Sequence, residues 1–203
     1  MPLNRKNANT LCAAVVDGLL AWNPLKAALQ NGGLESAGAV PIGIAIENFF
    51  SKNYPNKICV REYKIPSSKG RLRIDYALVD QASVGKACLK VEDVIEVKFN
   101  YANQRTELFN RTGKGLQQAA AYKNLTGATD AYLLYLVADP FSATKPGKPV
   151  DSGWKYWRKT GPILIPSPIT TITKASKFAS GTILGSNQKQ VGWCGLCCVL
   201  IQI

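Results

Sequence analysis

The middle of the chain contains two stretches in which apolar and polar residues alternate, as in strands whose successive side chains point to opposite faces. These stretches span residues 71–80 and 91–100. Their apolar faces are formed by Leu72, Ile74, Tyr76 and Leu78 in the first and by Ile95, Val97 and Phe99 in the second. Asp75, Glu96 and Lys98 then project together from the opposite face. The pattern therefore predicts two neighbouring strands that share an acidic edge.

The same reading predicts the elements around this pair. Apolar residues at helical spacing indicate helices at 7–22, 25–30, 37–53 and 112–125. Asn9 or Thr10 is the expected cap of the first helix and Thr112 that of the last, because short polar side chains accept hydrogen bonds from the first amides of a helix. Further strands are expected at 57–65, 131–138 and 191–203, and a polar surface loop at 101–111.

The expected fold class is α/β, in the form of an α+β mixed sheet with flanking helices. At 203 residues and 46% hydrophobic composition, the chain can bury one substantial core. We expect an N-terminal helical extension at 1–36, a core at 37–138 and a β-rich C-terminal extension at 139–203. Asp17 interrupts the apolar run near the N-terminus, and the last apolar run is too short to span a membrane. A soluble protein without a membrane partner is therefore expected.

The chain is strongly basic, with 25 Lys and Arg against 13 Asp and Glu and a formal net charge of +12. A polyanionic partner would release counterions on binding to such a surface, so nucleic acid is the leading candidate. A merely solvated cationic surface remains the alternative.

Histidine is absent, which removes the commonest general base and the commonest metal ligand. Serine hydrolases with a catalytic histidine, histidine-dependent ribonucleases and histidine-metal nucleases are excluded. Catalysis would have to use carboxylates, lysine, tyrosine or cysteine. A metal held by carboxylates would be a hard cation such as Mg²⁺ or Mn²⁺.

The six cysteines indicate a reduced, cytoplasmic protein, because several lie in apolar segments where a free thiol acts as a small hydrophobe. Cys194 and Cys197 have the spacing of a metal or redox pair. No second pair or histidine completes a zinc site, so the role of the cluster with Cys198 stays open.

The acidic edge resembles the active-site signature of the PD-(D/E)XK nuclease superfamily, with Ile74-Asp75 in place of Pro-Asp and Glu96-Val97-Lys98 supplying the rest. Gln118 and Tyr122, four residues apart on one helix face, resemble the Gln-x-x-x-Tyr motif of RecB-like members. The order helix, three strands, helix, strand between residues 37 and 138 is similar to the αβββαβ core of the restriction-endonuclease-like fold. The resemblance covers about half of the chain.

The resemblance implies roles for these residues. Asp75, Glu96 and Lys98 would be catalytic, and Gln118 and Tyr122 would support the site. Metal ligands would be Asp75, Glu96, the Val97 carbonyl and Glu47, with Glu35 and Glu62 as weaker substitutes for Glu47. Arg73 would steady a phosphate, and Lys98 would position or deprotonate the attacking water.

Several basic and aromatic side chains are candidates for contact with nucleic acid. They are Arg105, Arg111, Lys114, Trp154, Lys155, Trp157 and Arg158. Aromatics interleaved with cations can stack on bases and pair with phosphates, although the tryptophans can equally pack in an edge strand.

The resulting expectation is a Mg²⁺- or Mn²⁺-dependent deoxyribonuclease, an endonuclease rather than an exonuclease. RNA as substrate, a homodimer, and an immunity protein or methyltransferase as partner stay open. Restriction, repair, mobile-element and toxin roles share this core, and no sequence specificity is predicted because only 139–203 could supply a groove-reading element. A non-catalytic nucleic-acid-binding protein on the same fold is the alternative.

Overall fold

The computed structural model describes residues 3–22, 34–66, 72–101, 105–140, 170–184 and 190–203. In these ranges the helices are α1 (Arg5–Ala21), α3 (Leu34–Asn53) and α4 (Arg105–Thr126). The strands are β1 (Lys57–Lys64), β2 (Arg73–Asp80), β3 (Val91–Tyr101), β4 (Asp130–Pro140), β5 (Thr170–Leu184) and β6 (Gln190–Gln202). A short 3₁₀ turn, Gln81–Ser83, follows β2. The predicted mixed α and β class is confirmed, and the order from α3 to β4 is helix, three strands, helix, strand.

All the strands belong to one mixed sheet in the order β1-β2-β3-β4-β6-β5. The pair β3 and β4 is parallel, and the other neighbours are antiparallel. The long helix α4 makes the crossover between the two parallel strands, as such a connection requires. The predicted last strand lies inside the sheet, between β4 and β5.

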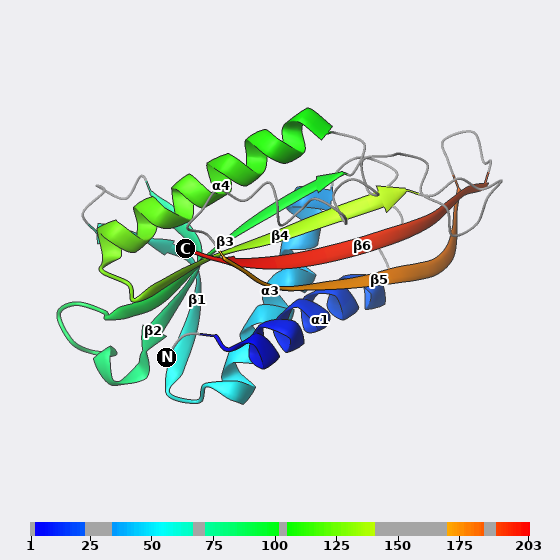
Figure 1. Ribbon diagram of the computed structural model, residues 1–203. Coiled ribbons are helices and arrows are strands. Elements are labelled where there is room, and N and C mark those ends of the chain that lie inside the picture. The colour runs from blue at the N-terminus through cyan, green and yellow to red at the C-terminus, as the bar shows by residue number, and fades with distance from the viewer. Residues whose placement is uncertain (1–2, 23–33, 67–71, 102–104, 141–169, 185–189) are drawn as a thin grey trace.

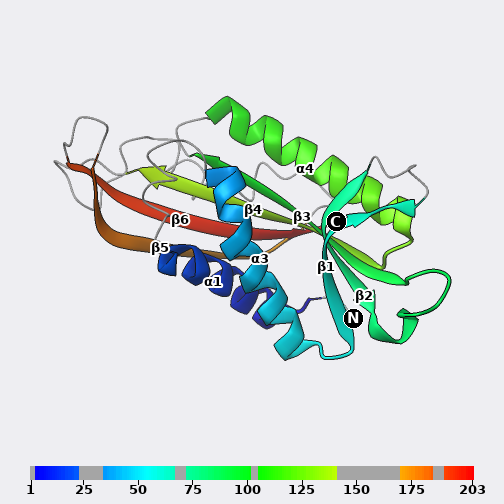
Figure 2. The same cartoon turned by 180° about the vertical axis from the view of Figure 1, so that it is seen from behind.

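The sheet is covered on both faces. Helices α1 and α3 lie on one face and α4 lies on the other, as the two opposite views show (Figures 1 and 2). Buried side chains form a core on each side. The larger core includes Leu11, Val15, Ile46, Phe50, Leu78, Ile95 and Tyr132, and the α4 side includes Ala77, Val79, Val94, Ala119 and Ala131. Burial on both faces explains why β4 is an almost continuous apolar run.

The alternation predicted for β2 holds only in part. Tyr76 and Leu78 enter the α1 side of the core, but Ile74 packs on the α4 side with Ala77 and Val79. Leu72 is exposed. The strict alternation ends where β2 stops pairing with β3, before Tyr76.

Two helix starts differ from the prediction. Helix α1 is capped by Asn4, whose side chain accepts a hydrogen bond from the Asn7 amide at 2.8 Å, so Asn9 and Thr10 lie inside the helix. Helix α4 begins at Arg105, so 105–111 is helical rather than a surface loop and Thr112 is not a cap. The polar composition of this segment concealed the helix, because the prediction relied on an apolar stripe. The expected helix at 25–30 lies outside the described residues.

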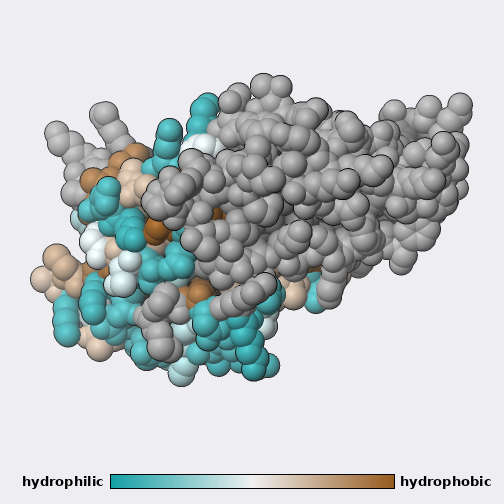
Figure 3. All heavy atoms as spheres, viewed as in Figure 1, coloured by the Kyte–Doolittle hydropathy of each residue, from teal (hydrophilic) through white to brown (hydrophobic). Residues whose placement is uncertain are grey.

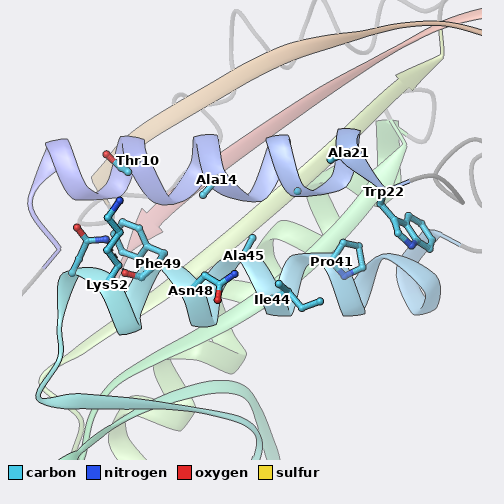
Figure 4. A pocket seen from close by; sticks show the side chains of 12 residues that line it. Thr10, Ala14, Ala21, Trp22, Pro41, Ile44, Ala45, Asn48, Phe49 and Lys52 are labelled. Atoms are coloured by element: carbon cyan, nitrogen blue, oxygen red, sulfur yellow. Dashed lines mark hydrogen bonds between the residues drawn. The ribbon is translucent and has the colours of Figure 1, made fainter.

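Small residues bring α1 and α3 close together. A Cβ atom added to Gly18 would lie 3.4 Å from the Ala45 Cβ atom. Beside this contact is an apolar groove of about 550 Å³, whose walls include Ala14, Trp22, Pro41 and Ile44 (Figure 4).

The surface of the described part that faces the viewer in Figure 3 is mainly hydrophilic, with hydrophobic side chains in small patches. No helix within the described ranges is both long and apolar enough to cross a membrane.

A buried ion cluster joins the beginnings of β1 and β3. Lys57 Nζ donates to Asp93 Oδ2 at 2.5 Å and lies 3.1 Å from Glu92 Oε2. The Lys57 and Asp93 side chains are each only 4% exposed. Burial raises the pKa of Asp93 despite Lys57. Desolvation opposes the charge on Lys57, but both carboxylates outweigh it and the net effect is a raised pKa of Lys57.

Two oxygens of this region have no hydrogen-bond partner among the described residues, namely Asp93 Oδ1 and Asp130 Oδ2. Asp93 and Asp130 are register partners on β3 and β4. The cluster therefore depends on Lys57 for its positive charge.

Replacing Lys57 by methionine should lower the free energy of unfolding by about 3–5 kcal/mol, because it leaves Asp93 as a buried charge without its cation. Urea unfolding at pH 7 measures this loss. Lys90→Met removes a cation that is 68% exposed and 3.5 Å from Glu92, and should change stability by less than about 0.5 kcal/mol. The double variant Lys57→Met/Asp93→Asn should recover most of the loss, and a single variant as stable as the wild type would contradict the cluster's role.

Candidate active site

Asp75 and Glu96 face each other at the point where the β2–β3 ladder ends. Tyr76 and Ile95 form the last described pair, and one further step in that register sets Asp75 beside Glu96. Beyond it no further β2–β3 pair is described. The Val97 amide donates to Asp75 Oδ2 at 2.7 Å. The carboxylate thus takes the place of a ladder carbonyl where the two strands separate.

Glu96 lies in an unfavourable place for a negative charge. The residue is 3% exposed, and burial raises the pKa of Glu96 to about 7, with the neighbouring Asp75 adding to the effect and Lys98 opposing it. Burial also raises the pKa of Asp75, against the Val97 amide and the Lys98 charge. Two carboxylates this close favour a shared proton or an added cation over two bare charges.

Lys98 extends from the same face of β3 as Glu96. Its Nζ atom donates to Glu96 Oε1 at 2.5 Å and its side chain is 20% exposed, so it reaches both the carboxylate and water. The other oxygen, Glu96 Oε2, is buried and accepts no hydrogen bond from any described residue. A buried carboxylate oxygen without a donor is costly, so this atom suits a ligand that supplies positive charge.

The donor set fits a hard divalent cation. Asp75 and Glu96 offer carboxylate oxygens, which Mg²⁺ and Mn²⁺ prefer. Within a strand the N–H and C=O of one residue point to the same side, so the Val97 carbonyl points into the gap that its amide shares with Asp75. These three groups are the ones the chain could use to hold such an ion.

Glu47 does not join this set. Arg61 Nε donates to Glu47 Oε1 at 2.5 Å and Arg61 Nη2 donates to Glu47 Oε2 at 3.1 Å, a bidentate pair between β1 and α3. The described ranges contain no group of three or more acidic or cysteine side chains placed to hold a metal. The assignment of Glu47 as a metal ligand is therefore not supported, because its carboxylate is committed to Arg61.

Glu62 is a further acid whose charge acts on Asp75. The β1–β2 register pairs Arg61 with Tyr76 and Tyr63 with Ile74, which sets Glu62 across from Asp75. Its charge contributes to the raised pKa of Asp75. Glu62 has a φ of 49°, a left-handed conformation that is uncommon for a side chain of this size. Glu35 belongs to α3, but its side chain is not described.

Arg73 lies at the start of β2, and its Nη1 atom is 3.6 Å from Glu62 Oε2. Both side chains are more than half exposed, so the pair stabilises little. Arg73 precedes Asp75 by two residues on the same strand, and its described ion pair is with Glu62.

Helix α4 carries the predicted Gln118 and Tyr122 to the site. The Tyr122 ring is buried, and burial followed by the charges of Glu96 and Asp75 raises the pKa of its hydroxyl. Gln118 opposes this shift. The Tyr122 hydroxyl is therefore close enough to both carboxylates for their charges to raise its pKa.

Glycine on α4 allows the helix to lie close to Lys98. A Cβ atom at Gly115 would lie 2.7 Å from Leu133 Cδ1 and 3.0 Å from Lys98 Cγ. No side chain fits there without a shift of these neighbours. The absence of a side chain at Gly115 therefore leaves room for the methylene chain of Lys98 against α4.

The proposed nucleic-acid contacts are described only in part. Lys114 is exposed on α4, and Arg105 and Arg111 lie on its first turns, although their side chains are not described. Trp154, Lys155, Trp157 and Arg158 lie outside the described residues.

A cavity of about 380 Å³ adjoins the acidic pair. It is lined by Asp75, Val97 and Lys98 from the site, together with residues of β1 and α3 that include Arg61 and Val40. The sequence analysis missed Arg61 and Gly115. A glycine inside a helix indicates close approach and could have marked Gly115, whereas the contact of Arg61 with Glu47 depends on how α3 packs on β1.

Replacing Glu96 by glutamine should stabilise the metal-free protein at pH 8. The folded pKa of about 7 exceeds the ordinary 4.5, so the native state binds more protons than the unfolded state between these values and its stability falls as pH rises through that window. A neutral side chain avoids this loss. Urea unfolding with a chelator present should show a gain of about 2–3 kcal/mol at pH 8 and little change at pH 4.

Glu92→Gln provides the control on the same strand. The hydrogen bond from Lys57 lowers the pKa of Glu92, so this variant should lose stability at pH 8, the opposite sign. A Glu96→Gln protein that is less stable at pH 8 would mean that Glu96 serves only in a salt bridge with Lys98.

Gly115→Ala should lower the stability of the protein and Gly113→Ala should raise it, although both glycines lie inside α4. Alanine normally stabilises a helix by about 1 kcal/mol relative to glycine, and nothing lies within 4 Å of a Cβ at Gly113. At Gly115 the clash with Leu133 should instead cost about 1–3 kcal/mol. Thermal unfolding of the two variants tests this, and an equal gain from both would show that α4 does not press on Lys98.

Comparisons of this chain with protein-family models, with curated proteins and with solved structures find no match. The assignment of a function therefore rests on the chemistry of Asp75, Glu96, Lys98 and the helix that faces them.

Proposed function

We propose that this protein is a metal-dependent nuclease that hydrolyses phosphodiester bonds in DNA. One observation carries the proposal. The buried Glu96 places an oxygen without a hydrogen-bond donor beside the Asp75 carboxylate, while Lys98 contacts its other oxygen at 2.5 Å. The buried Lys57–Asp93 pair also has an oxygen without a donor and a second acid beside it, but only here do the carboxylate Asp75 and the ammonium group of Lys98 line a described cavity.

The chemistry of phosphodiester hydrolysis matches these groups. A divalent cation bound to Asp75, Glu96 and the Val97 carbonyl would acidify a water and offset the charge that develops on the phosphate. Asp75 is fixed by the Val97 amide and Glu96 by Lys98, so both ligands are oriented beforehand. The Lys98 ammonium can hold the attacking water or a phosphate oxygen, and Tyr122 with Gln118 borders the site on the α4 side.

Two further features support this class of reaction. The order of α3, β1, β2, β3, α4 and β4 resembles that expected of a restriction-endonuclease-like core, and the motif residues fall on the elements that such a core would use. The net charge of +12 favours a polyanionic substrate. We favour an endonuclease without sequence specificity in a restriction-like, mobile-element or toxin role.

The purified protein should nick or degrade DNA with Mg²⁺ or Mn²⁺ and lose this activity when the metal is chelated. Asp75→Asn and Glu96→Gln should each lower the cleavage rate by at least about 100-fold, because each removes a charge that stabilises the transition state. Lys98→Gln should lower it by about 10²–10⁴-fold through loss of a positioned proton donor or acceptor. Gel assays on linear, circular and single-stranded DNA and on RNA measure the rates and identify the substrate.

Lys90→Gln is the matched control for Lys98→Gln. Lys90 also pairs with a glutamate of β3, Glu92, but its side chain is 68% exposed. This variant should cleave at the wild-type rate. Unchanged cleavage by Glu96→Gln would overturn the mechanism. Binding of DNA that yields no product from any substrate, and that persists in Glu96→Ala, would identify a non-catalytic binding protein instead.

A further inference from the structure

The cavity beside Asp75 is lined largely by apolar and aromatic side chains, whereas the candidate catalytic groups are charged. Its volume is about 380 Å³, at the lower end of the range for small-ligand pockets. Val40 and Ile42 line it from α3, and Tyr76 and Phe99 line it from the sheet. Asp75, Val97 and Lys98 are shared with the catalytic site. A phosphate held by the site would therefore place the neighbouring part of the substrate at the mouth of this cavity.

Arg61 gives the cavity a flat cation. Glu47 accepts from both Nε and Nη2, which fixes the plane of the guanidinium group. Gly43 makes room for it, because a Cβ atom at that position would clash with Arg61 Cζ. A guanidinium held flat is a surface on which an aromatic ring stacks without further loss of side-chain freedom.

We propose that this cavity binds one unpaired nucleobase of the substrate, so that the protein acts on single-stranded or locally unpaired nucleic acid. This inference rests on the proposed nuclease function and specifies its substrate. A base has an apolar face, which matches Val40, Ile42 and the Arg61 plane, and a polar edge, which Glu62 at the cavity wall can accept from. A base in a duplex is stacked and paired, so it reaches such a pocket only when it is extruded or already unpaired.

The alternative is a cavity that holds only solvent while a duplex lies across the site. A substitution at Val40 distinguishes a base pocket from a solvent-filled cavity. Val40 lines the cavity and is 57% exposed, so a larger side chain there can fill the space without entering the core. Ile44, one turn further along α3, is 50% exposed and lines the α1–α3 groove instead (Figure 4). The same substitution at Ile44 is thus a control for the effect of a new exposed tryptophan on the same helix.

The experiment measures binding and cleavage separately. Fluorescence anisotropy with Ca²⁺ in place of Mg²⁺ gives the affinity for a labelled single-stranded 12-mer, the matching duplex, and a series of strands in which one base at a time is removed to leave an abasic site. The wild type should prefer the single strand to the duplex by about tenfold or more, and abasic substitution at one position should weaken binding by about 5- to 100-fold, the range for loss of one stacked base. Val40→Trp should lose this preference and Ile44→Trp should keep it.

Arg61→Lys is the second variant, because it keeps the positive charge near Glu47 but removes the planar group and the bidentate pair. It should weaken single-strand binding by several-fold with the melting temperature unchanged, and it replaces Val40→Trp as the test if that protein does not fold. Equal affinity for single strand and duplex, or equal behaviour of Val40→Trp and Ile44→Trp, would overturn the inference.

Cleavage assays on circular single-stranded and duplex DNA distinguish the two proposals. The wild type could cut both DNA forms equally while Glu96→Gln cuts neither. In that case the nuclease function stands and the base pocket is wrong. If the wild type binds single strands with the abasic signature but cuts nothing with Mg²⁺ or Mn²⁺, the pocket stands and the nuclease proposal is wrong.

Discussion

The hydrogen bond from the Val97 amide to the Asp75 carboxylate is the contact on which the candidate site depends. It lies where β2 and β3 stop pairing, and it gives a backbone donor the acceptor that the ladder no longer provides. A side chain that replaces a ladder carbonyl is fixed by the sheet itself, not by a flexible loop. At this point the Val97 carbonyl also points toward β2, and the strand register sets Asp75 beside Glu96.

Strand β3 carries an acid on each face, and the two differ in what surrounds them. Asp93, on the α1 side, has the ammonium group of Lys57 almost fully buried against it. Glu96, on the α4 side, has a partly exposed Lys98 and a second carboxylate. An oxygen without a hydrogen-bond donor occurs in both places, so it does not by itself mark a site. What distinguishes the second place is the cavity that the neighbours of Glu96, Asp75 and Lys98, help to line.

The sequence predicted those features that depend on period and order. Alternation over β3 is enough to place Glu96 and Lys98 on one face, and a four-residue spacing is enough to place Gln118 beside Tyr122. It did not predict the start of α4, because residues 105–111 lack an apolar stripe. It also did not predict the partner of Glu47, since a carboxylate on a helix near a sheet can meet either a metal or an arginine, and only the packing of α3 on β1 places Arg61 against it.

The position of β6 has a consequence for how the sheet assembles. This strand follows β5 in the sequence and yet lies between β4 and β5, where it makes both sets of ladder contacts. During synthesis β2, β3 and α4 emerge first, while the far edge of β4 has no partner until residues 190–202 have left the ribosome. That interval exposes a strand edge of a kind that promotes pairing between chains. The sheet is therefore completed by the insertion of β6, and the speed of this step sets how long a nascent chain stays open to aggregation.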